Sequence, residues 1–161
     1  MGAIDWHLFV QEVRGMTSDT HPDEARTLLD HAREALPKAH APYSRFPVAA
    51  VVVDDQGREF VGVNVENASY GSTMCAERVA IFSAVAAGSK RLTALALVAK
   101  RLKPVSPCGA CRQVMTEFFS SDAPIYSDGG DGRVVSWRLR DLLPHAFTAD
   151  SLHATQDSPP E

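Results

Sequence analysis

The stretches CAER at residues 75–78 and PCGACRQ at residues 107–113 decide the fold, and together they contain all three cysteines of the chain. An apolar run at helical spacing follows each stretch, so a cysteine is expected where each of two helices begins. The N-terminus of a helix presents unpaired N–H groups and the positive end of its dipole, which lower the pKa of a nearby thiol. Because thiolates are zinc ligands, the pattern predicts two helices that meet at a metal site.

Cys75, Cys108 and Cys111 provide three thiolates, whereas tetrahedral zinc takes four ligands. Three protein ligands with water in the fourth position are typical of a catalytic site, because structural sites have four protein ligands. Glu77 follows Cys75 closely enough to reach such a water and to move its proton. We therefore predict one zinc per chain, bound by the three cysteines, with Glu77 as the catalytic acid and base.

Two other interpretations of the cysteines remain open at this point. Cys108 and Cys111 form a C-x-x-C pair that is also typical of redox proteins, although such a pair does not require Cys75. A histidine as fourth ligand would make the zinc purely structural. The candidates are His40, His145 and His153, and none of them lies inside either cysteine motif.

Zinc deaminases carry H-x-E, or a three-cysteine variant of it, followed by P-C-x-x-C. Both halves are present here, and the combination resembles the cytidine deaminase family, specifically its small three-cysteine, homotetrameric branch. The resemblance extends from about residue 28 to about residue 155. It includes three further motifs in the family's order: APYSRFPV at 41–48, NVENA at 64–68 and LLPHAF at 142–147.

The resemblance implies hydrolytic deamination of cytidine and 2'-deoxycytidine to uridine and 2'-deoxyuridine, with release of ammonia, as part of pyrimidine salvage. It also implies a set of contacts with the nucleoside. Asn64 and Glu66 would hold the ribose hydroxyls, Phe46 would flank the base, the Ala76 N–H would bind the base carbonyl, and the Ser106 carbonyl would accept from the 4-amino group.

Three further residues take roles from the same resemblance. Arg78 would hydrogen-bond the ligand thiolates and offset their negative charge. Tyr70 and Phe147 would contribute to the site of a neighbouring subunit, which implies a homotetramer with shared active sites. The alternatives are a deaminase of a modified cytosine nucleoside or nucleoside antibiotic, a nucleic-acid editing deaminase, and a zinc module without activity.

The residues around Glu66 support a sugar-binding role independently of the family. In a strand, Asn64 and Glu66 point to one face and Val65 to the other. A carboxylate at this place suits a free 3'-hydroxyl, which donates a charge-assisted hydrogen bond. It does not suit the phosphodiester of a polynucleotide, because like charges repel in a partly closed pocket.

Composition narrows the class of protein. The chain has 161 residues and a formal net charge of −4, with no basic block, so a nucleic-acid partner is not expected. We expect no membrane partner either, since no stretch reaches about 18 apolar residues. Three cysteines that all serve as ligands leave no disulfide pair, and the first residues do not have the pattern of a signal peptide. The cytoplasm is therefore the expected location.

The alternation of elements predicts an α/β fold, a three-layer α/β/α sandwich with a mixed five-stranded sheet. The predicted strands are 46–53, 58–65, 92–99, 124–127 and 134–137, and a first helix begins at Pro22 and kinks or ends near Pro37. Ala49 stands where the family usually has glycine, which could narrow the pocket or shift its strand. We expect an N-terminal extension (1–20), one deaminase-like domain (21–155) and a disordered tail (156–161).

Overall fold

The computed structural model describes residues 22–153, which form five helices, two 3-10 turns and one five-stranded sheet. The helices are α2 (Pro22–Ala35), α3 (Ala76–Ala86), α4 (Gly109–Phe118), α5 (Leu139–Leu142) and α6 (Ala149–His153). The strands are β1 (Val48–Asp54), β2 (Glu59–Val63), β3 (Leu92–Ala99), β4 (Pro124–Gly130) and β5 (Arg133–Arg138). The 3-10 turns are η2 (Leu36–Lys38) and η3 (Tyr70–Ser72).

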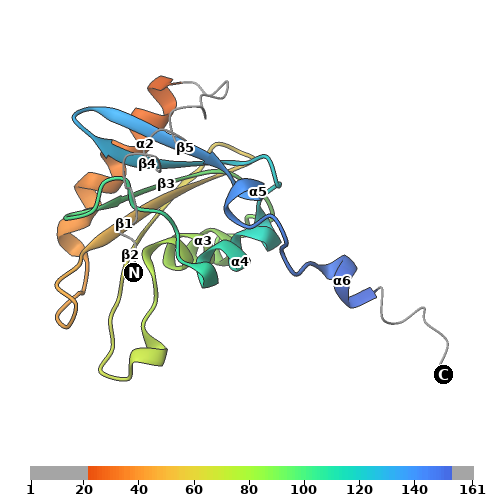
Figure 1. The fold of residues 1–161 in the computed structure, drawn as a ribbon, viewed down its shortest axis with the longest axis horizontal. Helices are drawn as coiled ribbons and strands as arrows, with labels where there is room; N and C mark the ends of the chain where they lie inside the picture. Colours follow the sequence, from red (N-terminus) through yellow and green to blue (C-terminus); the bar gives the residue numbers. More distant parts are fainter. Residues whose placement is uncertain (1–21, 154–161) are drawn as a thin grey trace, which may run out of the picture.

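The sheet is mixed, with strand order β2-β1-β3-β4-β5. Only the β3–β4 pair is parallel, and the helix α4 makes the crossover between these two strands. The pairs β1–β2, β1–β3 and β4–β5 are antiparallel. In Figure 1 the helix α2 lies on one face of the sheet, and α3 and α4 lie side by side on the other. The predicted three-layer α/β/α architecture is confirmed.

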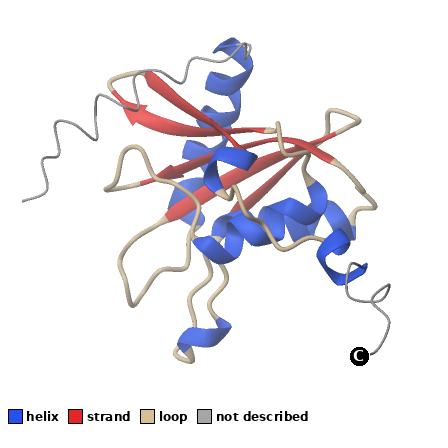
Figure 2. Cartoon of the chain, turned by 45° about the vertical axis from the view of Figure 1, so that its right-hand side comes forward, coloured by secondary structure: helices blue, strands red, loops and turns tan. Residues whose placement is uncertain are grey.

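Two apolar cores hold the layers together, one on each face of the sheet. Alternate residues of β1 point to opposite faces, so Ala50 and Val52 pack with α3 and α4, whereas Val51 and Val53 pack with α2. Figure 2 shows the loop that carries η3 projecting from the body between β2 and α3. The layer that contains α3 and α4 is the one that carries the cysteines.

Most predicted elements are confirmed, with differences at their ends. The first α-helix ends at Ala35 and Pro37 lies in a 3-10 turn, as expected for a proline at that place. The predicted second strand is too long, because β2 ends at Val63. Beyond it, Val65 makes only isolated bridges, to Met74 and His40. The predicted strand 124–127 is too short, because β4 continues through an irregular pairing with β5 as far as Gly130.

Ala49 does not narrow the pocket. Its side chain is fully buried in the core against α2, on the face of the sheet opposite to α3 and α4. Its strand keeps a regular register with both neighbours at this position. The added methyl group therefore fills space between β1 and α2.

The predicted extension (1–20), the tail (156–161) and the boundaries between them and the domain lie outside the described residues. No helix in the described part of the chain is both long and apolar enough to cross a membrane.

Candidate active site

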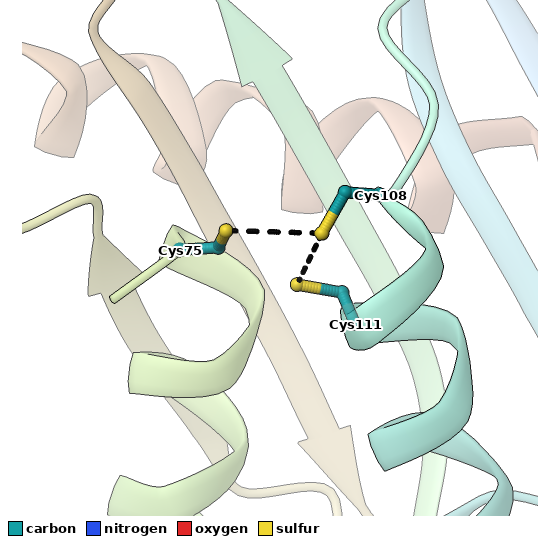
Figure 3. A group of neighbouring side chains, drawn as sticks. All are labelled: Cys75, Cys108 and Cys111. Carbon is teal, nitrogen blue, oxygen red and sulfur yellow. Dashed lines mark hydrogen bonds between the residues drawn. The ribbon is translucent and has the colours of Figure 1, made fainter. Parts of the chain in front are cut away.

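The three cysteines, which are separated in sequence, come together at the N-termini of two helices (Figure 3). Cys75 is the N-cap of α3 and Cys108 is the N-cap of α4, as the sequence predicts, and Cys111 lies in the first turn of α4. The sulfur atoms of Cys75 and Cys108 are 3.9 Å apart, and those of Cys108 and Cys111 are 3.5 Å apart. All three sulfurs lie within 4.8 Å of one another, and none of the cysteines forms a disulfide.

This geometry fits a zinc ion. Zinc–sulfur bonds of about 2.3 Å in a tetrahedron place the sulfur atoms about 3.8 Å apart, close to the observed distances. Within the described residues the group contains only the three cysteines, and neither His40 nor His145 belongs to it. The side chain of His153 lies outside the described part of the chain. The residues present therefore provide three sulfur donors.

Gly62 of β2 allows the first turn of α3 to lie directly against the sheet. A Cβ atom at this position would come within 2.3 Å of the Ala76 carbonyl oxygen and 2.4 Å of the Ala80 nitrogen, both of which belong to the helix backbone. Such distances are impossible without moving α3. Gly62 therefore sets how closely Cys75 and Glu77 approach the rest of the site, a role that sequence reasoning missed.

The surroundings of the thiols favour a thiolate at Cys75. A hydrogen bond from Cys111, supported by the Arg78 guanidinium and by Cys108, lowers the pKa of Cys75 from 9.0 to about 5, although burial opposes this. The same hydrogen bond, together with burial, raises the pKa of Cys111. Arg78 Nη2 lies 3.7 Å from the Cys75 sulfur and 3.4 Å from the Thr73 carbonyl oxygen. Arg78 is thus placed beside the thiol it was predicted to contact.

Glu77 is buried in the first turn of α3, with only 4% of its surface exposed. Burial raises its pKa above the ordinary value of 4.5, and the negative charge of Cys75 acts in the same direction. A raised pKa makes a carboxylate a better proton acceptor than an ordinary one. Its position and its pKa suit the role of acid and base predicted from the sequence.

The residues predicted to bind the sugar lie just beyond β2, against residues 43–48. The Asn64 side chain accepts a hydrogen bond from the Val48 N–H (2.9 Å) and donates one to the Phe46 carbonyl (3.0 Å). The Glu66 carboxylate accepts from the N–H groups of Tyr43 and Ser44 and from the Ser44 hydroxyl. Both side chains therefore already take part in the packing of this loop, which sequence alternation did not indicate.

A hollow of about 350 Å³ opens beside Glu66 and is lined by Tyr43, Ser44, Glu66, Tyr70 and Thr73. The rings of Tyr43 and Tyr70 meet edge to face, with centroids 6.0 Å apart. Tyr70 remains 75% exposed. The Thr73 carbonyl accepts from Arg78, so one wall of this hollow is joined to the cysteine group.

Ser106 and Phe147 are linked through α4. Arg112 donates to the Pro107 and Leu142 carbonyls (2.7 and 2.9 Å) and to the Ser106 hydroxyl (3.2 Å). Gln113 donates to the Phe147 carbonyl at 2.7 Å, and the Phe147 side chain is 59% exposed. Arg112 and Gln113 had no predicted role, although their place directly after Cys111 is the signal that could have indicated one.

The fold and this arrangement define a class of protein: hydrolytic enzymes with a zinc centre built on helix N-termini and a buried carboxyl group beside it. Residues 22–126 match the family described as the cytidine and deoxycytidylate deaminase zinc-binding region. The chain belongs to this family, and its cofactor is zinc.

Individual relatives agree with this assignment. The chain is 42% identical over 130 residues to a cytidine deaminase of Halalkalibacterium halodurans, a match that covers 81% of this chain and 98% of the relative. It is 44% identical over 125 residues to a cytidine deaminase of Mycobacterium tuberculosis, covering 78% and 90%. The solved structure of a cytidine deaminase from Burkholderia pseudomallei is 46% identical, with a TM-score of 0.71 and coverage of 75% and 97%.

Proposed function

We propose that this chain hydrolyses cytidine and 2'-deoxycytidine to uridine and 2'-deoxyuridine with release of ammonia. The observation that carries the proposal is the group of three sulfur atoms within 4.8 Å of one another beside the buried Glu77. Relatives named cytidine deaminase, aligned over most of the chain, support the same substrate class.

The proposed reaction replaces the 4-amino group of cytosine by oxygen from water. Zinc held by Cys75, Cys108 and Cys111 supplies an activated water when it is bound. Glu77 takes one proton from the attacking water and gives it to N3. It then takes the remaining proton from the oxygen added at C4 and gives it to the 4-amino group, which leaves as ammonia as the C4 carbonyl forms. Its raised pKa supports this double role, because a strongly acidic carboxylate would accept the first proton poorly.

We also assign several groups to the binding of the nucleoside. The Ala76 N–H belongs to the first turn of α3, where N–H groups have no partner within the helix, and we assign it to the base carbonyl. We assign the Ser106 carbonyl to the 4-amino group and Phe46 to one face of the base. Asn64 and Glu66 are assigned to the sugar.

We further propose a homotetramer in which Tyr70 and Phe147 reach the site of a neighbouring subunit. Both side chains are exposed, and so are Phe82 and Val85 on the outer side of α3, which is unusual for large apolar residues of one helix. Light scattering should give four times 17.4 kDa, about 70 kDa. A fully active monomer would refute the shared site.

We assign the enzyme to pyrimidine salvage in the cytoplasm. Free thiols as metal ligands are maintained in a reducing compartment, which supports this location.

One assay tests the proposed substrate. Ammonia release is measured with cytidine, 2'-deoxycytidine, an N4-modified cytidine, 3'-CMP and a short cytosine-containing single strand, on protein whose zinc content is known. We expect the two unmodified nucleosides to react and the two 3'-phosphorylated compounds to react slower by orders of magnitude, because their charge would meet Glu66. Comparable rates on the last two compounds, or reaction of the modified nucleoside alone, would overturn the proposal.

A further inference from the structure

The Glu66 carboxylate has little hydrogen-bonding capacity left. Its Oε2 atom accepts from the backbone N–H groups of Tyr43 (2.9 Å) and Ser44 (3.1 Å), and its Oε1 atom accepts from the Ser44 hydroxyl. An ionised carboxylate offers about four acceptor positions, two on each oxygen. Three are filled by protein groups, so one position on Oε1 remains.

Ser44 connects Glu66 with Phe46. While its hydroxyl donates to Glu66, the same oxygen accepts the Phe46 N–H at 3.0 Å. The Asn64 side chain holds the Phe46 carbonyl from the other side at 3.0 Å. The residue assigned to the sugar and the residue assigned to the base are therefore joined by one serine side chain.

The backbone around Ser44 is shaped for this contact. Arg45 has a positive φ of 52°, uncommon for a residue other than glycine, and its N–H closes a turn onto the Ala41 carbonyl at 3.1 Å. This turn brings the N–H groups of residues 43 and 44 onto one carboxylate oxygen. The cost of such a conformation is characteristic of segments whose geometry serves a site.

We propose that Ser44 is a positioning residue that orients Glu66 together with Phe46 and leaves the carboxylate one acceptor position, which takes the 3'-hydroxyl of the sugar. The inference rests on the proposed function and adds to it a residue that positions the sugar-binding carboxylate. The hollow lined by Ser44 and Glu66 is the place where this end of the substrate would lie.

The test compares 2'-deoxycytidine with 2',3'-dideoxycytidine, which differ only in the 3'-hydroxyl. For the wild type we expect kcat/KM to favour 2'-deoxycytidine by about a hundredfold or more, because the contact is charge-assisted. In Ser44→Ala, kcat/KM for 2'-deoxycytidine should fall about tenfold, and for 2',3'-dideoxycytidine it should change less than about twofold. In this variant kcat/KM for cytidine should fall by the same factor as kcat/KM for 2'-deoxycytidine.

Two further variants control the result. Ser44→Thr keeps the hydroxyl and should keep the wild-type preference. Ser120→Ala removes an exposed hydroxyl after α4, at the other end of the sheet, and should leave kcat/KM unchanged for both substrates. Zinc content is measured for every variant, and one zinc per chain shows that the metal site is intact.

The outcomes separate the inference from the proposed function. An equal loss of rate on both substrates in Ser44→Ala would show a merely structural role and overturn the inference, as would an unchanged preference. If Ser44→Ala does not retain zinc, Ser44→Thr decides, and loss of the preference in that variant overturns the inference. A wild type that deaminates neither cytidine nor 2'-deoxycytidine would overturn the proposed function itself.

Discussion

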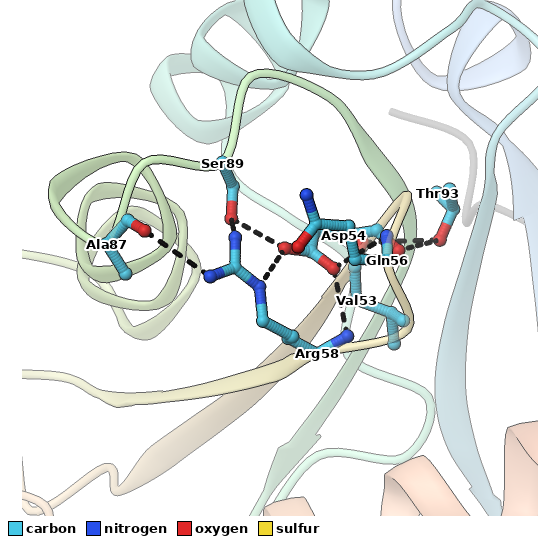
Figure 4. A network of polar contacts seen from close by, with 7 residues as sticks. All are labelled: Val53, Asp54, Gln56, Arg58, Ala87, Ser89 and Thr93. Carbon is cyan, nitrogen blue, oxygen red and sulfur yellow. Dashed lines mark hydrogen bonds and ion pairs between the residues drawn. The ribbon is translucent and has the colours of Figure 1, made fainter.

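The two ends of α3 each lie beside a buried carboxylate, and the two carboxylates are in opposite states. Near the C-terminal end, Asp54 is fully buried and accepts four hydrogen bonds, from the N–H groups of Gln56 and Arg58, the Arg58 guanidinium and the Ser89 hydroxyl (Figure 4). Burial alone would raise the pKa of Asp54, but these hydrogen bonds lower it from 3.8 to about 2. At the N-terminal end, burial dominates and raises the pKa of Glu77.

The difference shows what separates a structural carboxylate from a reactive one in this fold. All four acceptor positions of Asp54 are filled, so its charge is held and it joins the β1–β2 turn to the end of α3, where Arg58 also reaches the Ala87 carbonyl. Glu77 is also buried, but its hydrogen bonds with its own backbone N–H and with Cys111 do not offset the effect of burial, so its pKa stays raised. Glu66 is intermediate between these two carboxylates in hydrogen bonding, because three of its four acceptor positions are filled. The remaining position suits it to bind a substrate hydroxyl. The number of hydrogen bonds that each carboxylate accepts therefore agrees with its proposed role: structural for Asp54, binding for Glu66 and catalytic for Glu77.

The largest effect is expected from removing a metal ligand at the reactive end. Cys108→Ala should lose both zinc and turnover, because two thiolates no longer complete the donor set. Zinc bound per chain and the rate of cytidine deamination are measured on the same sample. Normal zinc content in this variant would contradict the ligand assignment.

Glu77→Gln should separate chemistry from metal binding. The side chain keeps its size but cannot exchange protons, so turnover should fall by about 10²–10⁴-fold or more while zinc content stays at one per chain. Glu117→Gln, on an exposed part of α4, is the matched control and should keep full activity. Substantial turnover in Glu77→Gln would rule out its role as acid and base.

At the other end of α3, substitutions should change stability and leave chemistry intact. Ser89→Ala removes one hydrogen bond to the buried, charged Asp54, which should cost about 1.5–3 kcal/mol of the free energy of unfolding. For a chain of this length the loss corresponds to a decrease in Tm of about 3–12 °C. Thermal unfolding checks the value, with Ser83→Ala on the exposed side of α3 as control. A large loss of turnover at 25 °C in the folded variant would contradict the purely structural role of the C-terminal end of α3.

The smallest effect is a dependence of stability on pH that comes from Asp54. Its folded pKa, about 2, lies below the ordinary value of 3.8, so its contribution is complete above about pH 4 and is lost as the pH falls through 2. The difference in Tm between the wild type and Asp54→Asn should therefore shrink between pH 5 and pH 2. Since both proteins carry the same cysteines, protonation of the thiols cancels in this difference. A constant difference over that range would contradict the lowered pKa.

Sequence patterns predicted the elements well and their ends less well. Proline and the cysteine motifs act locally on backbone conformation, which is why the end of α2 and the starts of α3 and α4 were predicted correctly. The end of β2 was predicted too late, because the apolar and polar alternation continues past Val63 whereas the ladder with β1 does not. Pairing partners, and not alternation alone, decide where a strand ends.

The amino-acid sequence by itself determined the class of chemistry: three thiols, a carboxylate beside the first of them, and motifs shared with one family of deaminases. Only the tertiary structure decided how these groups behave. The close approach of Gly62 to α3, the burial that raises the pKa of Glu77, the Ser44 contact with Glu66 and the Ser89 contact with Asp54 depend on segments far apart in the chain. Residue type and spacing determine which groups can react, whereas burial and hydrogen bonding depend on packing between distant segments and determine which of them are held and which are left reactive.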